Sequence, residues 1–145
     1  FGTSASVAVV HKDSKLRTLA DLVNYAKANP GKVFYGYYNS ASQITAAVFS
    51  ARSGAGMTGV SYKAIGNAFT DLLGGQIQVI FTEYLPAIPQ MKSGTVHALA
   101  VTGSKRYKPW PQVPAVAETY PGYEIGFHLG LAAPAGVPAP IIAKY

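Results

Sequence analysis

The sequence predicts an α/β fold in which helices cover both faces of a mostly parallel sheet, a three-layer αβα arrangement. Short apolar runs alternate with amphipathic segments along the 145 residues. The apolar runs are nearly continuous, which is typical of strands that are buried on both faces. Hydrophobic residues make up 49% of the chain and charged residues only 12%, so the chain can build a core and intrinsic disorder is excluded.

The elements follow from these runs and from the residues that flank them. Strands are predicted at residues 6–11, 33–37, 57–62, 77–81, 96–101 and 127–133. Thr18 is a suitable N-cap with Asp21 three residues later, and the helix that follows stops at 29–31 (Asn-Pro-Gly). Further helices are predicted from the polar turn at 39–42 to about residue 52, at 67–73 and at 85–92, with one helical turn at 116–120 and a helix start at Pro138.

Charge and cysteine content narrow the kinds of partner. The absence of cysteine excludes disulfides and cysteine-based metal or nucleophile sites. The net charge is +6, but only Lys105, Arg106 and Lys108 cluster, so we expect no nucleic-acid partner. A positive field would also favour a small anionic ligand. No apolar run approaches a membrane span and no signal-peptide pattern occurs, which leaves a cytoplasmic protein or a mature or excised fragment.

The sequence offers little for catalysis. His11, His97 and His128 lie in or beside predicted strands and far apart along the chain, which is typical of structural histidines. The six acidic residues form no pair at helical or strand spacing, and no GxSxG, HExxH or P-loop motif occurs. We therefore expect no catalytic residue, no cofactor and no metal site.

Three loops after predicted strands are candidates for ligand binding, because ligands of open α/β sheets lie beyond the carboxyl ends of the strands. The first loop consists of Tyr37, Tyr38, Asn39, Ser40, Ala41 and Ser42. Small polar residues at a helix start suit a carboxylate or a phosphate. No charge occurs from residue 37 to residue 51, so we expect this helix to bring no anion of its own. The alternative is an ordinary N-cap at Ser40 or Ser42.

The second and third loops carry single charges. Tyr62, Lys63 and Ala64 follow the strand at 57–62, where Lys63 either faces an anion or is an ordinary surface lysine. Thr82 and Glu83 follow the strand at 77–81. Glu83 either binds a ligand hydroxyl or ammonium group, or caps the next helix. Tyrosines at these strand ends offer flat rings for stacking on a ligand, although packing is the alternative.

The order and spacing of five segments point to a known family. They are LRTLADLVNYAKANPGKVFYG (16–36), SYKAIGNAFTDLLGGQIQVIF (61–81), IPQMKSGTVHALAVTGSKR (88–106), PQVPAVAE (111–118) and PGYEIGFHLGLAAPAGVPAPIIAK (121–144). Each segment is weak evidence alone, but the set covers most of the chain and is specific. The chain resembles the substrate-binding proteins of tripartite tricarboxylate transporters, also called the Bordetella uptake gene family.

The resemblance implies the fold, the domain organisation and the function. It implies a lobe like those of type II periplasmic binding proteins, since the family chain has two lobes and about twice this length. Residues 1–145 are then expected to form the second lobe, with its core at about 12–125 and with 1–11 and 126–145 as hinge or crossover segments toward the first lobe. The function implied is periplasmic binding of a small organic carboxylate, such as a dicarboxylate or an aromatic carboxylate, for delivery to a membrane permease.

The chain departs from the family pattern at the expected site. The family usually has YGSSGNGTS after the second strand, whereas residues 35–42 read YGYYNSAS. We therefore expect a bulkier or aromatic acid that stacks on Tyr37 or Tyr38. A family aromatic residue near the last strand falls at His128. Alternatives are an effector-sensing lobe of a regulator, or a fragment that binds no ligand and oligomerises, for example as a homodimer.

Overall fold

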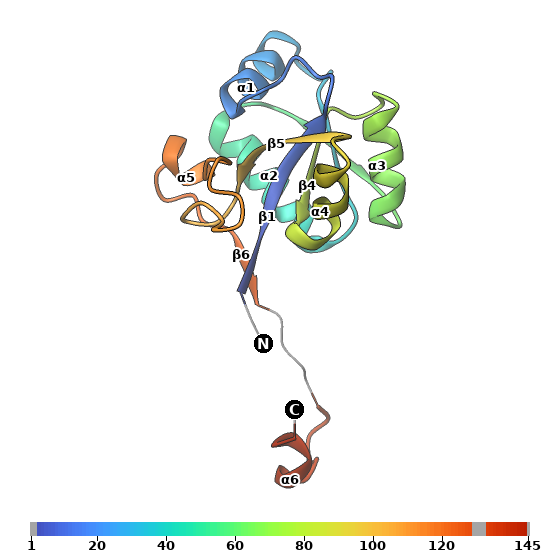
Figure 1. Cartoon of the computed structure of the whole chain (residues 1–145), viewed down its shortest axis with the longest axis vertical. Helices are drawn as coiled ribbons and strands as arrows, with labels where there is room; N and C mark the ends of the chain where they lie inside the picture. Colours follow the sequence, from blue (N-terminus) through green and yellow to red (C-terminus); the bar gives the residue numbers. More distant parts are fainter. Residues whose placement is uncertain (1–2, 129–132, 145) are drawn as a thin grey trace.

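The central sheet mixes parallel and antiparallel strands, in a computed structural model that describes residues 3–128 and 133–144. The strands are β1 (Thr3–His11), β2 (Phe34–Tyr37), β3 (Thr58–Ser61), β4 (Val79–Glu83), β5 (Val96–Val101) and β6 (Gly126–His128). Their order is β3-β2-β4-β1-β5. β6 pairs with β1 off this path and lies beside it in Figure 1.

Strand direction separates β1 from the others. β2 pairs parallel with β3 and β4, whereas β1 pairs antiparallel with β4, β5 and β6. Because β4, β5 and β6 all run against β1, every strand of the described chain except β1 shares one direction. The α/β prediction is confirmed, but the sheet is mixed, since three of its five pairings are antiparallel. The reversed direction of β1 was not predictable, since a strand buried on both faces shows the same apolar run in either direction.

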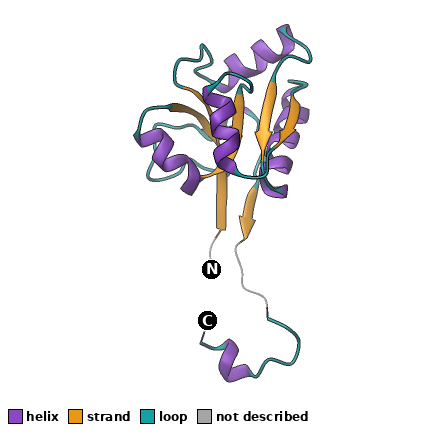
Figure 2. Cartoon of the chain, turned by 90° about the vertical axis from the view of Figure 1, so that its right-hand side faces the viewer, coloured by secondary structure: helices purple, strands orange, loops and turns teal. Residues whose placement is uncertain are grey.

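Helices cover both faces of the sheet, which confirms the three-layer prediction (Figures 1 and 2). The helices are α1 (Leu19–Ala28), α2 (Ser40–Ser53), α3 (Ile65–Leu73), α4 (Tyr84–Lys92), α5 (Val116–Thr119) and α6 (Ala139–Ile142). Side chains alternate along β1, so that Ala8 and Val10 share a core with residues of α1 and α2. Val7 and Val9 point to the other face and share a core with residues of α3 and α4.

Local signals set the helix ends. The Thr18 hydroxyl accepts from the Asp21 N–H at 3.1 Å, and the Asp21 carboxylate accepts from the Thr18 N–H at 2.9 Å, which is the predicted capping box. α2 ends at Gly54, whose φ of 64° is left-handed and favours glycine. Within the described residues, no helix is long and apolar enough to cross a membrane.

Aromatic packing fixes α2, the helix that begins at the first candidate loop. The fully buried Phe49 lies 5.4 Å, between ring centroids, from Phe81 on β4, and its ring meets those of Tyr120 and Tyr123 edge to face. The hydroxyl of the buried Tyr123 donates to the carbonyl of Thr45 at 3.0 Å. These contacts hold α2 against both β4 and the chain after α5.

Some element boundaries differ from the prediction. α3 begins at Ile65 rather than at residue 67, and β6 covers Gly126–His128, whereas residues 129–132 of the predicted strand lie outside the described residues. Residues 7–10 of β1 are fully buried at the centre of the sheet. The division into a lobe core and hinge segments stays a prediction.

Candidate functional site

The three candidate loops meet at the carboxyl edge of the sheet, because β2 lies between β3 and β4. The register pairs Tyr37 with Ser61 across β2 and β3, and Gly36 with Ile80 across β2 and β4. The Tyr62 N–H donates to the Tyr37 carbonyl at 2.8 Å. Residues at the ends of three different strands therefore lie side by side. Thr82 and Glu83, predicted to follow the strand at 77–81, are instead the last two residues of β4.

The N-cap of α2 is Asn39, not Ser40 or Ser42. The side-chain oxygen of Asn39 accepts from the Ser42 N–H at 2.8 Å. The Ser42 hydroxyl accepts from the N–H groups of Tyr38 and Asn39, at 3.1 and 3.2 Å, and donates to the Asn39 carbonyl. Ser42 is fully buried, so its side chain shapes the loop, whereas Ser40 is exposed and Ala41 is half-buried.

The side chain of Glu83 binds the β2–α2 loop rather than α4. One carboxylate oxygen accepts from the Tyr38 hydroxyl, and the other accepts from the Asn39 amide nitrogen at 3.0 Å. The Tyr38 hydroxyl also lies 3.0 Å from the hydroxyl of the fully buried Thr82. Residues 37–42 and 82–83 thus form one hydrogen-bonded cluster.

The helix-cap alternative for Glu83 is therefore wrong, whereas α2 has no acidic residue in its first turn, as expected. Glu83 occupies the N-cap position of α4, but its side chain makes no capping hydrogen bond there. The start of α2 does have an anion from the protein itself, supplied by β4 rather than by residues 37–51. The physical reason is the pairing of β2 with β4, which joins residues 44 positions apart and which local sequence does not reveal.

The second loop faces α3. The Tyr62 hydroxyl donates to the Asp71 carboxylate at 2.8 Å, and burial together with this bond raises the pKa of Tyr62 to about 12. The Tyr62 hydroxyl therefore donates its proton to α3 and not to a ligand. Lys63 and Ala64 are exposed, and Ala64 is the N-cap of α3 without a side-chain hydrogen bond. α3 therefore begins with neither a polar cap nor an acidic residue in its first turn.

Tyr37 has less free ring surface than the stacking hypothesis assumed. It is half-buried, packs against the core on the α1 and α2 side, and its ring centroid lies 6.2 Å from that of Tyr35. The Tyr38 ring is half-buried as well. Stacking of an aromatic acid on either ring stays a prediction.

Sequence reasoning missed Ser6 on β1. Ser6 pairs with Glu83 in the antiparallel register, so the two side chains lie on the same face. It is fully buried, and its hydroxyl has no hydrogen-bond partner among the described residues. A hydroxyl inside an otherwise apolar strand was the only available signal.

His11 and His97 each make one polar contact with the backbone. The Nδ1 atom of His11 accepts from the Asp13 N–H at 3.1 Å, and Nε2 of His97 lies 3.3 Å from the Arg17 carbonyl. The side chain of His128 lies outside what the structure describes. Across residues 3–128 and 133–144, no three His, Asp or Glu side chains gather where they could hold a metal ion.

A pocket of about 400 Å³ is lined by residues of α4, of the segment after β5 and of the chain around β6, and by none of residues 37–42 or 82–83. Its lining includes Tyr84, Leu85, Lys105, Tyr107 and Glu124. Tyr84 directly follows Glu83, and its ring stacks on that of Tyr107 at 4.1 Å between centroids. Lys105 brings a positive charge to this pocket, whereas the neighbouring Arg106 is paired with Glu118 at 2.7 Å.

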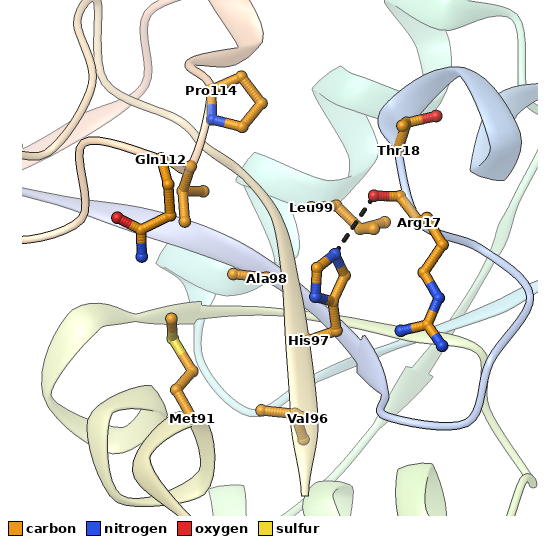
Figure 3. A pocket seen from close by; sticks show the side chains of 10 residues that line it. Arg17, Thr18, Met91, Val96, His97, Ala98, Leu99, Gln112 and Pro114 are labelled. Atoms are coloured by element: carbon orange, nitrogen blue, oxygen red, sulfur yellow. Dashed lines mark hydrogen bonds between the residues drawn. The ribbon is translucent and has the colours of Figure 1, made fainter. Parts of the chain in front are cut away.

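A second pocket, of about 480 Å³, lies near the amino end of β5 and away from these loops (Figure 3). Figure 3 shows His97 directed at the Arg17 carbonyl, with Met91 and Gln112 also on the lining. Because ligands of this fold class lie beyond the carboxyl ends of the strands, we place the candidate site at the Glu83 cluster.

Comparisons with known proteins identify the family of the chain and agree with its fold. A family model described as "Tripartite tricarboxylate transporter family receptor" matches residues 1–145. A UPF0065 protein of Agrobacterium vitis is 35% identical over 139 residues, which are 94% of this chain and 40% of that protein. A protein of R. palustris solved with adipate has a TM-score of 0.92 at 29% identity, covering 98% of this chain and 48% of that one.

MatC from Rhodopseudomonas palustris, solved with bound malate, has a TM-score of 0.87 at 26% identity, covering 98% of this chain and 49% of that one. The chain spans between 38% and 44% of the length of the curated relatives it matches. Since the family model matches the whole chain, the protein belongs to the tripartite tricarboxylate transporter receptor family.

Proposed function

We propose that this chain is one lobe of a periplasmic solute-binding protein that binds a small organic carboxylate and delivers it to the membrane permease of a tripartite tricarboxylate-type transporter. The observation that carries the proposal is the convergence of three strand-end loops at one edge of the sheet. The family membership supports it, as do the structural neighbours solved with adipate and malate. The proposed role is binding and presentation, without chemical conversion of the ligand.

The start of α3 is the part of this edge best suited to a carboxylate. Its first N–H groups have no side-chain cap, and an uncapped helix start attracts anions. Lys63 lies immediately before it and is exposed. A Cβ atom added at Gly66 would meet nothing within 4 Å, so there is open space beside the first turn. We infer that Lys63 and these N–H groups face the ligand carboxylate.

The test is a titration of the ¹⁵N-labelled chain with succinate, malate and adipate, followed by amide chemical shifts. One lobe supplies only part of a cleft, so weak affinity is expected and the method must detect millimolar binding. The shifts should centre on residues 37–42, 62–66 and 82–84. Lys63→Gln should weaken binding about two- to fivefold, the range for an exposed ion pair.

Lys92→Gln is the matched control. Lys92 is also exposed, but it lies in the last turn of α4, away from the carboxyl edge, so its loss should leave the affinity unchanged. Shifts that are absent for all three acids, or that Lys92→Gln reduces as much as Lys63→Gln does, would contradict the proposed site. Light scattering of the same samples tests the separate expectation of a homodimer.

A further inference from the structure

We propose that Glu83 determines ligand selectivity: the site favours a carboxylic acid that also carries a hydroxyl or ammonium group over the plain acid of the same length. This inference rests on the proposed function. It starts from the observation that the carboxylate of Glu83 already occupies the start of α2, where an incoming anion would otherwise be attracted.

The contacts of Glu83 leave it able to accept further hydrogen bonds. A carboxylate has about four lone-pair sites on its two oxygens. Glu83 receives one bond at each oxygen, from the Tyr38 hydroxyl and from the Asn39 amide, and both of these partners are neutral. Among the described residues, no Lys, Arg or His forms an ion pair with Glu83. Its negative charge is therefore uncompensated, and the side chain is only half-buried.

An uncompensated carboxylate discriminates between ligand groups. A second carboxylate placed against Glu83 would be repelled, whereas a hydroxyl or an ammonium group would donate to its unused lone pairs. Tyr38 and Asn39 fix the position of the carboxylate from two directions, so its acceptor sites are oriented before a ligand arrives. Glu83 thus strengthens the binding of a ligand that carries a hydrogen-bond donor and weakens the binding of one that carries an extra negative charge.

Ser6 adds a second polar group at the same place. It lies directly opposite Glu83 in the sheet, is fully buried and has a hydroxyl without a partner in the described part of the chain. A buried hydroxyl is rarely left unpaired. The register therefore places an unpaired hydroxyl on the same face of the sheet as Glu83, although its full burial keeps it from direct contact with a ligand in this structure.

The experiment compares succinate, malate and aspartate, which share a four-carbon diacid skeleton and differ only in hydrogen, hydroxyl or ammonium at one carbon. Their dissociation constants are measured by titration of the ¹⁵N-labelled chain. Malate and aspartate should bind about tenfold more tightly than succinate, the ratio supplied by one hydrogen bond to a charged group. Glu83→Gln should bring this ratio to about one and should improve succinate binding.

The control is Glu124→Gln, which removes the same charge from a pocket that no residue of the cluster lines, and it should leave the ratio unchanged. A second variant, Glu83→Ser, serves if Glu83→Gln does not give a dispersed amide spectrum, and it should also abolish the preference. If all three acids bind equally, or if the ratio survives both Glu83 variants, the inference is overturned while the proposed function stands. If no acid binds the wild-type chain, the proposed function is overturned, and the inference about selectivity is overturned with it.

Discussion

The hydrogen bond between Tyr38 and Glu83 is one of the side-chain bonds that join the β2–α2 loop to β4, and its removal should destabilise the fold. We expect Tyr38→Phe to lower the free energy of unfolding by about 2 kcal/mol. The substitution keeps the ring and removes only the hydroxyl, which contacts both Glu83 and Thr82. The packing of the half-buried ring is therefore preserved.

The magnitude follows from the two contacts. A hydrogen bond to a charged group contributes about 1.5–3 kcal/mol, and the half-exposed position of Glu83 argues for the lower end. Thr82 is fully buried and lies 3.0 Å from the Tyr38 hydroxyl, so its own hydroxyl loses a partner where water cannot replace it. This second contribution is below about 1 kcal/mol, since a neutral hydrogen bond is worth about that much.

Urea unfolding followed by far-ultraviolet circular dichroism measures the effect. A double-mutant cycle with Glu83→Gln isolates the pair, and the two substitutions should couple by about 1 kcal/mol. Tyr25→Phe is the control, because Tyr25 is an exposed tyrosine on α1, and it should change stability by less than about 0.5 kcal/mol. The reasoning would be refuted if Tyr38→Phe changed the free energy of unfolding by less than about 0.5 kcal/mol. It would also be refuted if the effects of Tyr38→Phe and Glu83→Gln simply added in the double variant.

Three further substitutions test other parts of the fold. Tyr123→Phe should cost about 1–2 kcal/mol in urea unfolding, because the buried carbonyl of Thr45 loses its donor; no loss would contradict this bond. Hydrogen bonds from Arg106 and then from the Ala115 N–H hold the pKa of Glu118 at about 2, below its ordinary value of 4.5. The stabilisation that comes from this lowered pKa is complete above about pH 4.5 and is lost as the pH falls toward 2. Glu118→Gln should therefore make the free energy of unfolding depend less on pH between these values. The same pH dependence in the variant and the wild type would contradict this. Ser6→Ala should raise the ligand-free Tm, since it removes an unpaired buried hydroxyl, whereas a lower Tm would mean that the hydroxyl is satisfied.

The individual elements were largely predictable because each depends on neighbouring residues. The apolar run at Val96–Val101 is the fifth strand with the predicted bounds, and Thr18 with Asp21 forms the predicted capping box. The strand order was not predictable, because it depends on long-range pairing. An apolar run such as residues 6–11 shows that a strand is buried, but neither its direction nor its neighbours.

The candidate site divides in the same way. Fold class alone placed Tyr38, Asn39 and Glu83 at loops beyond strand ends, and the structure brings them into one cluster. That the Glu83 carboxylate reaches Asn39 instead of capping α4 depends on the pairing of β2 with β4. The burial of Ser42, and hence its structural role, likewise depends on tertiary packing.

Two of the helix starts at the carboxyl edge of this sheet, those of α2 and α3, have opposite electrostatic character. α2 begins at a polar cap and faces Glu83, whereas α3 begins at Ala64 without a cap and follows Lys63. β2 separates β3 from β4, so the two regions lie about 10 Å apart, or two strand spacings. A ligand with a carboxylate at one end and a donor at the other would therefore bind in one orientation. Lys63→Gln should weaken every carboxylate alike and leave the preference for a donor unchanged, while Glu83→Gln should improve succinate binding and remove that preference, because the two residues act on different groups of the ligand.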